Sequence, residues 1–471
     1  MPTSLRDLVP VRAEKNSRTF LFVLLAELVV LLIVICLALP AGVAADGPNV
    51  NGQPDSSDQQ FQQSPDGSRL NRESSGTILT HDGQKLRLVL DLGNVIIKTT
   101  NTGKIDYNVR LEVNSAEKGA QRLLRNFAVS ARETPDGVYF RGQTFGHQSS
   151  GRLWVTVELN IPKNYNVDVV TGGGNIESQD ANGRVSLVTA GGSIVAGNIG
   201  GAAHLETAGG HLTVKNVEGD LFAVSGGGHI TTGAISGSAN LHTNGGHIRA
   251  ESIHGPAHLS TGGGNISVQH SDSELVAETV GGQIEVGETS GLVKAKNGGG
   301  SIHVVRVSGP TNLETSGGSI YLTEVDSAVK ASTSTGGITA WFVTPPKQHS
   351  QCELQSSGGD IVVYIPRELP VTIDAQVQSG DEHQLSFDPA FNTTFRHNDS
   401  QHGGASVSAQ GSLNGGGEVI HLRTIDGTIR VVMSDVAKQL QLYKQQMLQL
   451  QQKSALQLRQ LQESREAQNG K

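Results

Sequence analysis

The sequence predicts an all-β protein, a single-stranded β-solenoid (β-helix) with 18-residue rungs, preceded by an N-terminal transmembrane helix and followed by a C-terminal amphipathic helix. The main observation is the phrase TNGGHI at residues 243–248, which returns in closely similar form every 18 residues. A fixed period near 20 residues indicates a stacked repeat architecture. The chain of 471 residues also contains 59 Gly and only 4% aromatic residues, which is too little bulky side chain for a large globular core.

The first element is an apolar run over residues 20–39, which follows a short cytoplasmic segment, residues 1–19. The run, FLFVLLAELVVLLIVICLAL, contains one charge, Glu27. A helix of about 20 apolar residues matches a bilayer core of about 30 Å, and the Lys and Arg residues before it place the N-terminus in the cytoplasm. We expect Glu27 to be tolerated as a protonated or snorkelling acid; a partner contact within the membrane is the alternative.

A second interpretation of the N-terminus is a signal peptide cleaved near Ala45, because small residues precede Asp46. The apolar run is longer than the ~7–15 residues of a secretory signal, which favours an uncleaved anchor. Both interpretations export the rest of the chain. We therefore expect a single-pass inner-membrane protein with its bulk periplasmic or extracellular, or a secreted protein if cleavage occurs. No disulfide is expected between Cys36 and Cys352.

Two segments separate the anchor from the repeats. Residues 46–75 are polar and rich in Gly, Pro, Ser, Asp and Gln, which predicts a disordered linker. Residues 76–170 contain alternating runs such as LRLVLDLGNVIIKT, which predict β-strands. A short helix or turn is expected within AEKGAQRLLRNFAV. Because the open edges of a strand stack invite aggregation, we expect this region to cap the N-terminal end of the solenoid.

The solenoid repeats cover residues 171–343, one coil per repeat. Short alternating runs within each repeat predict two or three strands per coil, stacked about 4.8 Å apart. Equal coil length would place like residues over like in one interior column, and the paired glycines are expected to turn corners through positive φ. The column comprises Ile176, Ile194, Leu212, Ile230, Ile248, Ile266, Ile284, Ile302, Ile320 and Ile338.

Two elements follow the repeats. Residues 344–434 are predicted to form C-terminal solenoid turns and a cap, because SSGGDIVVYIP resumes the repeated phrase after a Pro-containing loop. Residues 435–467 lack Gly and Pro and place Leu440, Tyr443 and Met447 on a 3–4 spacing, which predicts an amphipathic helix. Self-association as a coiled coil and packing against the end of the solenoid both remain open for this helix.

One column of the repeat raises the question of a metal site. His211, His229 and His247 precede the core residue in successive repeats, and His is a common ligand of Zn and Cu. The same column also contains Asn, Ser and Gln, which is typical of a polar ladder at a corner. We favour the ladder and predict no metal. Four further histidines, His204, His242, His254 and His258, are expected on the surface.

The acidic residues do not predict an enzyme. Glycoside hydrolysis usually needs two carboxylates that face one cleft, whereas Glu206, Glu278 and Glu314 share a column but lie four and two coils apart. Local pairs, Glu218 with Asp220 and Glu324 with Asp326, are expected at solvated corners. We therefore predict no catalytic residues, no cofactor-binding residues and no cofactor. The net charge of −8 argues against nucleic acid as a partner.

The repeated column of Thr residues allows two interpretations. Stacked Thr suits strands and would face a corner or the core; an exposed array that recognises ice or a crystalline polymer is the alternative. We favour the first interpretation because the Ile column and the Gly turns run beside it.

The run VTVELNIPKNYNVDVVTGGGNI, the TxGGxI phrases and the closing SSGGDIVVYIP and TIDGTIRVVM resemble the bacterial "putative adhesin" family, a domain-of-unknown-function group of exported β-solenoids. The resemblance covers residues 77–434. It implies adhesion as a function and defines no catalytic or binding residues that could be carried over.

These observations together predict a non-catalytic cell-envelope β-solenoid that presents a repeat surface to a protein or glycan partner on the exported side, with the membrane contacted through residues 20–39. One alternative is a regulatory or stress-sensing envelope protein, although residues 1–19 are too few for a cytoplasmic signalling domain. Another is a carbohydrate-active β-helix enzyme.

Overall fold

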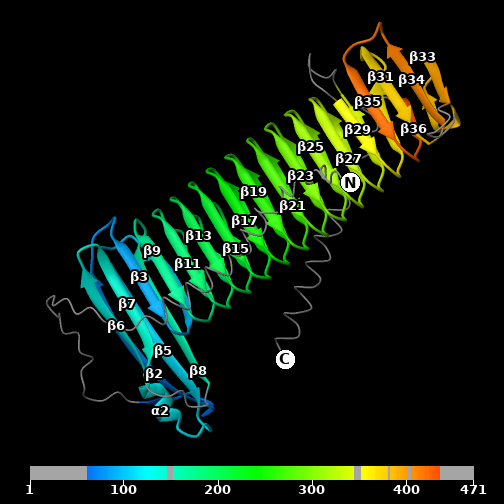
Figure 1. Ribbon diagram of the computed structural model, residues 1–471. Coiled ribbons are helices and arrows are strands. Elements are labelled where there is room, and N and C mark those ends of the chain that lie inside the picture. The colour runs from blue at the N-terminus through cyan, green and yellow to red at the C-terminus, as the bar shows by residue number, and fades with distance from the viewer. Residues whose placement is uncertain (1–60, 146–151, 344–351, 380–381, 400–404, 435–471) are drawn as a thin grey trace, which may run out of the picture.

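The computed structural model describes residues 61–145, 152–343, 352–379, 382–399 and 405–434, which form a long rod of stacked strands (Figure 1). The N-terminal strands lie at one end of the rod and the last strands at the other. The predicted membrane anchor, the linker up to residue 60 and the predicted helix at 435–467 lie outside the described residues. Within the described ranges, no helix combines the length and apolarity needed to cross a membrane.

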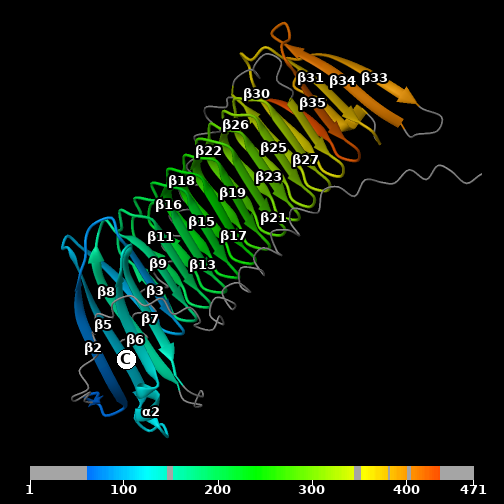
Figure 2. The same cartoon turned by 60° about the vertical axis from the view of Figure 1, so that its left-hand side comes forward.

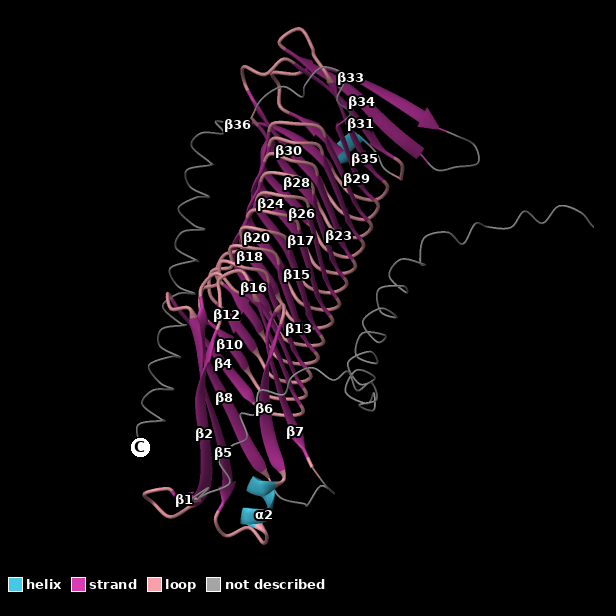
Figure 3. Cartoon of the chain, turned by 90° about the vertical axis from the view of Figure 1, so that its left-hand side faces the viewer, coloured by secondary structure: helices cyan, strands magenta, loops and turns pink. Residues whose placement is uncertain are grey.

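The strands form two long sheets, which we name sheet A and sheet B, on two faces of the rod (Figure 2). Each middle repeat contributes one strand to each sheet, and the turns between the strands form rows along the rod (Figure 3). The expected all-β solenoid is confirmed.

Sheet A has 18 strands. In the order of their pairing they are β1 (Gln62–Gln63), β2 (Arg69–Leu79), β5 (Lys104–Asn114), β8 (Leu153–Pro162), β4 (Asn94–Thr100), β10 (Ile176–Ser178), β12 (Ile194–Ala196), β14 (Leu212–Val214), β16 (Ile230–Ile235), β18 (Ile248–Ile253), β20 (Ile266–Ser271), β22 (Ile284–Thr289), β24 (Ile302–Val307), β26 (Ile320–Val325), β28 (Ile338–Phe342), β30 (Ile361–Pro366), β36 (Ile429–Ser434) and β32 (Leu385–Phe387).

Sheet B lies opposite. In the order of their pairing its strands are β6 (Phe127–Thr134), β7 (Gly137–Thr144), β3 (Lys85–Leu90), β9 (Asn166–Thr171), β11 (Val185–Thr189), β13 (Ala203–Thr207), β15 (Leu221–Ser225), β17 (Ala239–Thr243), β19 (Ala257–Thr261), β21 (Leu275–Thr279), β23 (Val293–Asn297), β25 (Thr311–Thr315), β27 (Val329–Thr333), β29 (Cys352–Ser356), β35 (Val419–Thr424), β31 (Val371–Val377), β34 (Ala405–Leu413) and β33 (Asn392–Asp399). Two short helices, α2 (Ala120–Arg125) and η1 (Glu382–Gln384), complete the described elements.

The interior column of the repeats has the predicted register. Ile230 of β16 pairs with Ile248 of β18, and Ile248 pairs with Ile266 of β20, in parallel strands. All three side chains are at most 1% exposed. Sheet B supplies the opposite wall of the core, where Leu241 lies over Leu259. Equal coil length therefore does place like residues over like, because the strand period of 2 fixes which side chains point inward.

The Thr column closes a corner of each coil from the inside. Thr243 is fully buried; its hydroxyl donates to the carbonyl of Gly228 at 2.9 Å and accepts from the N–H of Gly246 at 3.2 Å. The hydroxyl thus joins the turn of its own coil to the turn of the preceding one. The interpretation that Thr faces the corner is confirmed, and an exposed Thr array for recognition is wrong.

Asn297 takes the place of Thr in this column and makes both hydrogen bonds, one to the turn of the preceding coil and one to the turn of its own coil. Its amide Nδ2 donates to the carbonyl of Gly282 at 2.6 Å, and its Oδ1 accepts from the N–H of Gly300 at 2.9 Å. A short side chain with one donor and one acceptor is what the corner requires, since a buried polar group without a partner is costly.

The glycines of the repeated turns are needed for a reason other than the expected one. Of the described glycines, positive φ occurs at Gly67, Gly83, Gly93, Gly119, Gly137, Gly174, Gly415 and Gly416, and the pair Gly245–Gly246 is not among them. A Cβ on Gly246 would lie 2.0 Å from the carbonyl oxygen of Gly228, whereas a Cβ on Gly245 would meet nothing within 4 Å. The expectation of positive φ holds in these turns only at Gly174, in the first of them. In the later turns the second glycine is needed because successive coils approach closely.

The strands before the repeats are longer and partly antiparallel. β5 lies between β2 and β8 and pairs antiparallel with both, and β8 joins the stack through parallel pairing with β4. The expected short helix within 116–129 is α2, which buries Leu123 and Leu124. These strands, together with the turn before β9, cover the end of the core with large side chains, among them Phe127, Phe140 and, in that turn, Tyr165.

At the other end, the chain leaves the 18-residue register. β30 pairs with β36, and β29 pairs with β35, so that segments 68 residues apart in sequence lie side by side. β31, β34 and β33 continue sheet B, with antiparallel pairing between β31 and β34 and between β34 and β33. Cys352 is buried and not in a disulfide.

Candidate functional site

A column of polar side chains runs along an outer corner of the coils, one residue before each core Ile. From Asn175 to Asn265, each side chain accepts a hydrogen bond from the backbone N–H of the residue 18 positions later. Asn175 Oδ1 accepts from Ser193 at 2.9 Å, and Ser193 Oγ accepts from His211 at 3.1 Å. These side chains continue the backbone hydrogen-bond ladder around the corner, which accounts for the short acceptor-bearing residues found there.

The three histidines extend this same ladder. His211 Nδ1 accepts from the N–H of His229 at 2.9 Å, and His229 Nδ1 accepts from His247 at 2.9 Å. The last ring accepts from Asn265 at 2.8 Å. Nδ1 of His is the same number of bonds from Cα as Oδ1 of Asn, so the two residues are equivalent as acceptors here. The rings stack with centroids 4.9 and 4.8 Å apart.

This geometry disfavours a metal at His211, His229 and His247. A neutral imidazole whose Nδ1 accepts a hydrogen bond carries its proton on Nε2, so neither nitrogen offers a free lone pair. Partial burial, followed by the neighbouring charges of His247 and His211, lowers the pKa of His229. The neutral, hydrogen-bonded form is therefore the one the stack favours. Among the described residues there is no group of three or more His, Cys, Asp or Glu side chains arranged to hold a metal.

The acidic residues singled out from the sequence do not converge. Glu278 and Glu314 lie on the outer face of sheet B, two coils apart, with Lys296 between them in the register. Glu206 lies four coils away in the same column. Asp220 is a turn residue: its Oδ1 accepts from the N–H of Ser238 at 2.8 Å and from its hydroxyl at 2.7 Å, which lowers the pKa of Asp220. Glu324 forms an ion pair with Arg306 at 2.6 Å.

A polar network on the outer side of sheet A was not expected from the sequence. Asp272 accepts from His254 Nδ1 at 2.5 Å and from His270 Nε2 at 2.8 Å. These side chains come from consecutive coils, 18 residues apart or less, and are well exposed. The hydrogen bonds from the two rings lower the pKa of Asp272, with that of His254 the larger. The carboxylate is occupied by the two rings, so this network holds the surface in place.

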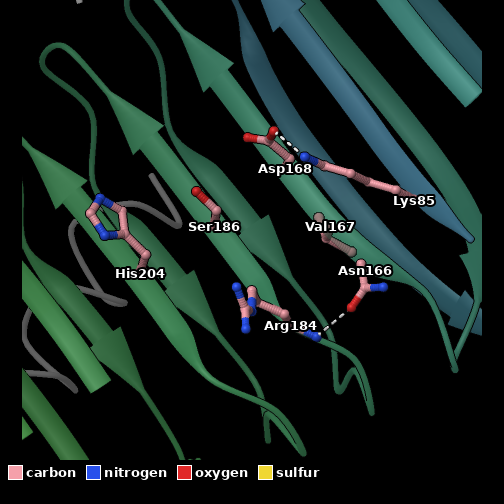
Figure 4. Close-up of a pocket in the computed structure, with 7 residues that line it drawn as sticks. All are labelled: Lys85, Asn166, Val167, Asp168, Arg184, Ser186 and His204. Carbon is pink, nitrogen blue, oxygen red and sulfur yellow. Dashed lines mark hydrogen bonds and ion pairs between the residues drawn. The ribbon is translucent and has the colours of Figure 1, made fainter. Parts of the chain in front are cut away.

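A groove lies on sheet B at the junction of the N-terminal strands and the first coils (Figure 4). Its volume is about 590 Å³, within the range of small-molecule sites. The lining residues come from β3, β9, the turn before β11, β11 and β13, and they are Lys85, Asn166, Val167, Asp168, Arg184, Ser186 and His204. We call this the junction groove.

Ion pairs and hydrogen bonds position two sides of the junction groove. The Lys85 ammonium lies 2.9 Å from Asp168 Oδ2, and Arg87 Nε lies 3.9 Å from the same oxygen. Asn166 Oδ1 accepts from the backbone N–H of Arg184 at 2.9 Å. The Arg184 side chain is exposed and, among the described residues, forms no ion pair.

An aromatic stack forms the third side of the groove. The His204 ring lies 4.9 Å from the Phe222 ring with an interplanar angle of 11°, and His204 Nε2 lies 3.4 Å from Glu206 Oε2. His204 was expected to be a surface residue, and its side chain is 44% exposed. The sequence signal for this groove was present only in part: Ser186, His204 and Phe222 share one outward column, but Lys85 precedes the repeats.

Comparison with known proteins identifies the domain. Residues 84–314 match the family described as Toastrack DUF4097. Over these residues the chain is similar to the DUF4097 domain. The resemblance to a domain-of-unknown-function family is thereby confirmed. The match spans the N-terminal strands from β3 onward, the junction groove and most of the coils.

No curated protein matches the chain. Several solved structures show distant similarity, among them the following three. A "putative adhesin" from Parabacteroides distasonis ATCC 8503 is 12% identical, with 62% of this chain and 96% of that chain covered and a TM-score of 0.27. A second, from Bacteroides fragilis NCTC 9343, is 13% identical, with 53% and 96% covered and a TM-score of 0.27. A "putative cell adhesion protein" from Clostridium sporogenes ATCC 15579 is 9% identical, with 77% and 100% covered and a TM-score of 0.15. Similarities of this size do not indicate what the chain binds.

Proposed function

We propose that the chain is a non-catalytic β-solenoid of the bacterial cell envelope, anchored in the membrane through residues 20–39, that presents the outer faces of its coils to a protein or glycan partner. The observation that carries the proposal is the contrast between the inner and outer columns of the same strands. The inner column of sheet A is Ile in nearly every coil, and each member is buried. The outer column beside it changes at almost every step.

The outer column of sheet A reads Glu177, Val195, Thr213, Thr231, Arg249, Ser267, Glu285, His303, Tyr321 and Thr339. Stacking alone does not require this variation, because Thr or Val at every position would suit exposed strands. A rigid backbone with variable exposed side chains is a suitable arrangement for specific recognition. Scattered exposed apolar residues such as Val195 are normal on any surface, so we attribute recognition to the pattern as a whole.

The absence of catalysis is part of the same proposal. Its support is the arrangement of the acids: Glu278 and Glu314 share one flat sheet face with Lys296 between them, and glycosidases need two carboxylates on either side of a scissile bond. The alternatives are an envelope regulatory protein and a carbohydrate-active β-helix enzyme.

The test uses the full chain and two variants that leave the core unchanged. One replaces every outward side chain of β10 to β28 in sheet A by Thr, and the other does so for β9 to β27 in sheet B. Binding of the purified proteins to intact bacterial cells and to a glycan array is compared with the wild type. We expect both variants to melt as the wild type does and at least one to lose binding.

Two results would contradict the proposal. Wild-type binding by both variants would show that the sheet faces are not the recognition surface. Release of new reducing ends from a bound glycan would show that the protein is an enzyme. Membrane fractionation with mass spectrometry of the mature N-terminus tests the anchor separately.

A further inference from the structure

The junction groove contains a slot one coil wide. The register of sheet B places Asp168, Ser186 and His204 in one outward row on β9, β11 and β13. Adjacent strands are about 4.8 Å apart, so Asp168 and His204 are separated by roughly 9.6 Å. Ser186 between them has a short side chain, and Figure 4 shows its hydroxyl between the Asp168 carboxylate and the His204 ring. The gap over Ser186 is wide enough for one flat ring.

One wall of this slot is an aromatic face held in a fixed orientation. Phe222 belongs to the coil that follows His204, and the two rings are stacked nearly parallel. The opposite face of the His204 ring is therefore directed toward the coil that holds Ser186. Aromatic faces carry partial negative charge and attract the positively polarised edges of neighbouring groups, including the C–H bonds of a sugar ring.

The polar groups around the slot favour a ligand that has both a negative charge and hydroxyl groups. Asp168 is neutralised by Lys85 and approached by Arg87, so its carboxylate oxygens can accept hydrogen bonds from hydroxyl groups. The Arg184 guanidinium forms no ion pair within the described part of the chain and lines the same hollow. Arginine binds carboxylates through paired, charge-assisted hydrogen bonds. The groove thus contains a guanidinium that can bind a carboxylate and a carboxylate that can accept hydrogen bonds from hydroxyl groups.

We propose that the junction groove binds an acidic sugar residue of a polysaccharide, with the sugar ring over Ser186 against His204 and its carboxylate on Arg184. The inference rests on the proposed function and names the ligand class for one part of the surface. An acidic peptide fits less well, because it would bring its carboxylates toward Asp168 and would leave the slot and the hydroxyl-accepting groups unused.

The test is isothermal titration calorimetry of the full chain with a hexamer of galacturonic acid. Its fully methyl-esterified form and hexaglutamate serve as comparison ligands. We expect the acidic hexamer to bind and both comparison ligands to bind at least tenfold more weakly. Arg184→Gln should weaken binding of the acidic hexamer at least tenfold, and Ser186→Tyr should abolish it by filling the slot.

Arg396→Gln is the matched control, because Arg396 is an exposed arginine on β33, outside the coils and at the other end of the rod from the groove; it should bind as the wild type does. All variants should keep the wild-type melting temperature. Unchanged binding by Arg184→Gln, or equal affinity for hexaglutamate, would overturn the proposal. Failure of the acidic hexamer to bind would also overturn it, whereas the proposed function fails if the two sheet-face variants retain cell and glycan binding or if a bound glycan is cleaved.

Discussion

The strands before residue 171 and the coils after it bury their apolar side chains in different ways. The N-terminal region uses strands of 10 or 11 residues, β2, β5 and β8, in antiparallel pairs, and it buries large side chains such as Tyr165 and Phe140. The coils use parallel strands of three to six residues and bury Ile, Leu, Val and Ala. Each packing contact in the N-terminal region occurs only once in the molecule, whereas every coil makes the same set of contacts with its neighbours.

This difference determines how the loss of one strand or coil affects the folding of its neighbours. Each coil contacts the coil before it and the coil after it, so stability is approximately a sum of nearest-neighbour terms. β5, in contrast, holds β2 on one side and β8 on the other. Losing a coil shortens the stack, while losing β5 separates two strands that have no other link.

The largest expected effect compares two deletions of equal length. Removal of residues 231–248, one whole coil, should leave a folded protein, because Ile230 then precedes Arg249 as Ile248 does in the wild type, and every later coil keeps its register. Removal of residues 104–121, which contain β5, should prevent folding of the N-terminal region. Circular dichroism and thermal melting of both variants measure the difference. Equal loss of structure in the two would contradict independent coils.

A charge within the core column should be the most damaging point change in the coils. Ile248 is 1% exposed and lies between Ile230 and Ile266. Ile248→Asp removes its packing and buries a carboxylate, which we expect to cost about 5 kcal/mol or more. Chemical denaturation gives the change in the free energy of unfolding, and Arg249→Asp, one residue further along and exposed, is the control. If the Ile248→Asp variant proved more stable than the coil deletion, the stacked-coil account would be wrong.

Glycine substitutions sharpen the comparison, because the two regions need glycine for different reasons. Gly246→Ala would force a Cβ against the Gly228 carbonyl, and we expect a loss of about 2–3 kcal/mol from overpacking. Gly83→Ala in the N-terminal region has open space but a φ of +84°, so a loss of about 1–2 kcal/mol from backbone strain is expected. Gly245→Ala has open space and no positive φ, and it should be nearly neutral. Urea denaturation measures the free energy of unfolding of the three variants, and a different order of losses would contradict this explanation.

The smallest expected effect is the response of the histidine ladder to acid. The pKa of His229 is lowered in the folded protein, first by partial burial and then by His247 and His211. The unfolded chain therefore binds a proton more readily. The contribution of His229 to stability is complete above the ordinary His pKa of about 6.5, is lost as the pH falls through that value, and levels off below the lowered pKa.

His229→Asn is the matched variant for this effect, because Asn fills the same column at positions 175 and 265 with Oδ1 as the acceptor. The melting temperature of the wild type should fall more between pH 7.5 and pH 5 than that of the variant. An identical pH dependence in both proteins would show that the ladder is insensitive to protonation.

The register of the coils could be predicted from the sequence because it is carried by many copies of one phrase. The pairing of Ile230, Ile248 and Ile266 follows from equal spacing alone. The role of the glycines could not be predicted, since Gly245 and Gly246 look alike in sequence and differ only in how near the preceding coil approaches. The strand order β2–β5–β8–β4 could not be predicted from the sequence either, because these strands are not repeated and nothing in their sequences indicates which strands pair.

The junction groove was missed for a related reason. Ser186 and His204 are 18 residues apart and share a column, but Lys85 belongs to β3, which enters sheet B from outside the repeat. A site formed where a repeated and a non-repeated region meet has no periodic signal of its own. Its decisive feature, a small side chain between two large ones, becomes apparent only when the register of three strands is known.

The constant length of the coils has a consequence for how such a protein can evolve. In-frame duplication or loss of one 18-residue unit would change the reach of the molecule by about 4.8 Å and leave the junction groove intact. Natural selection could therefore adjust the length of the rod independently of the shape of the junction groove.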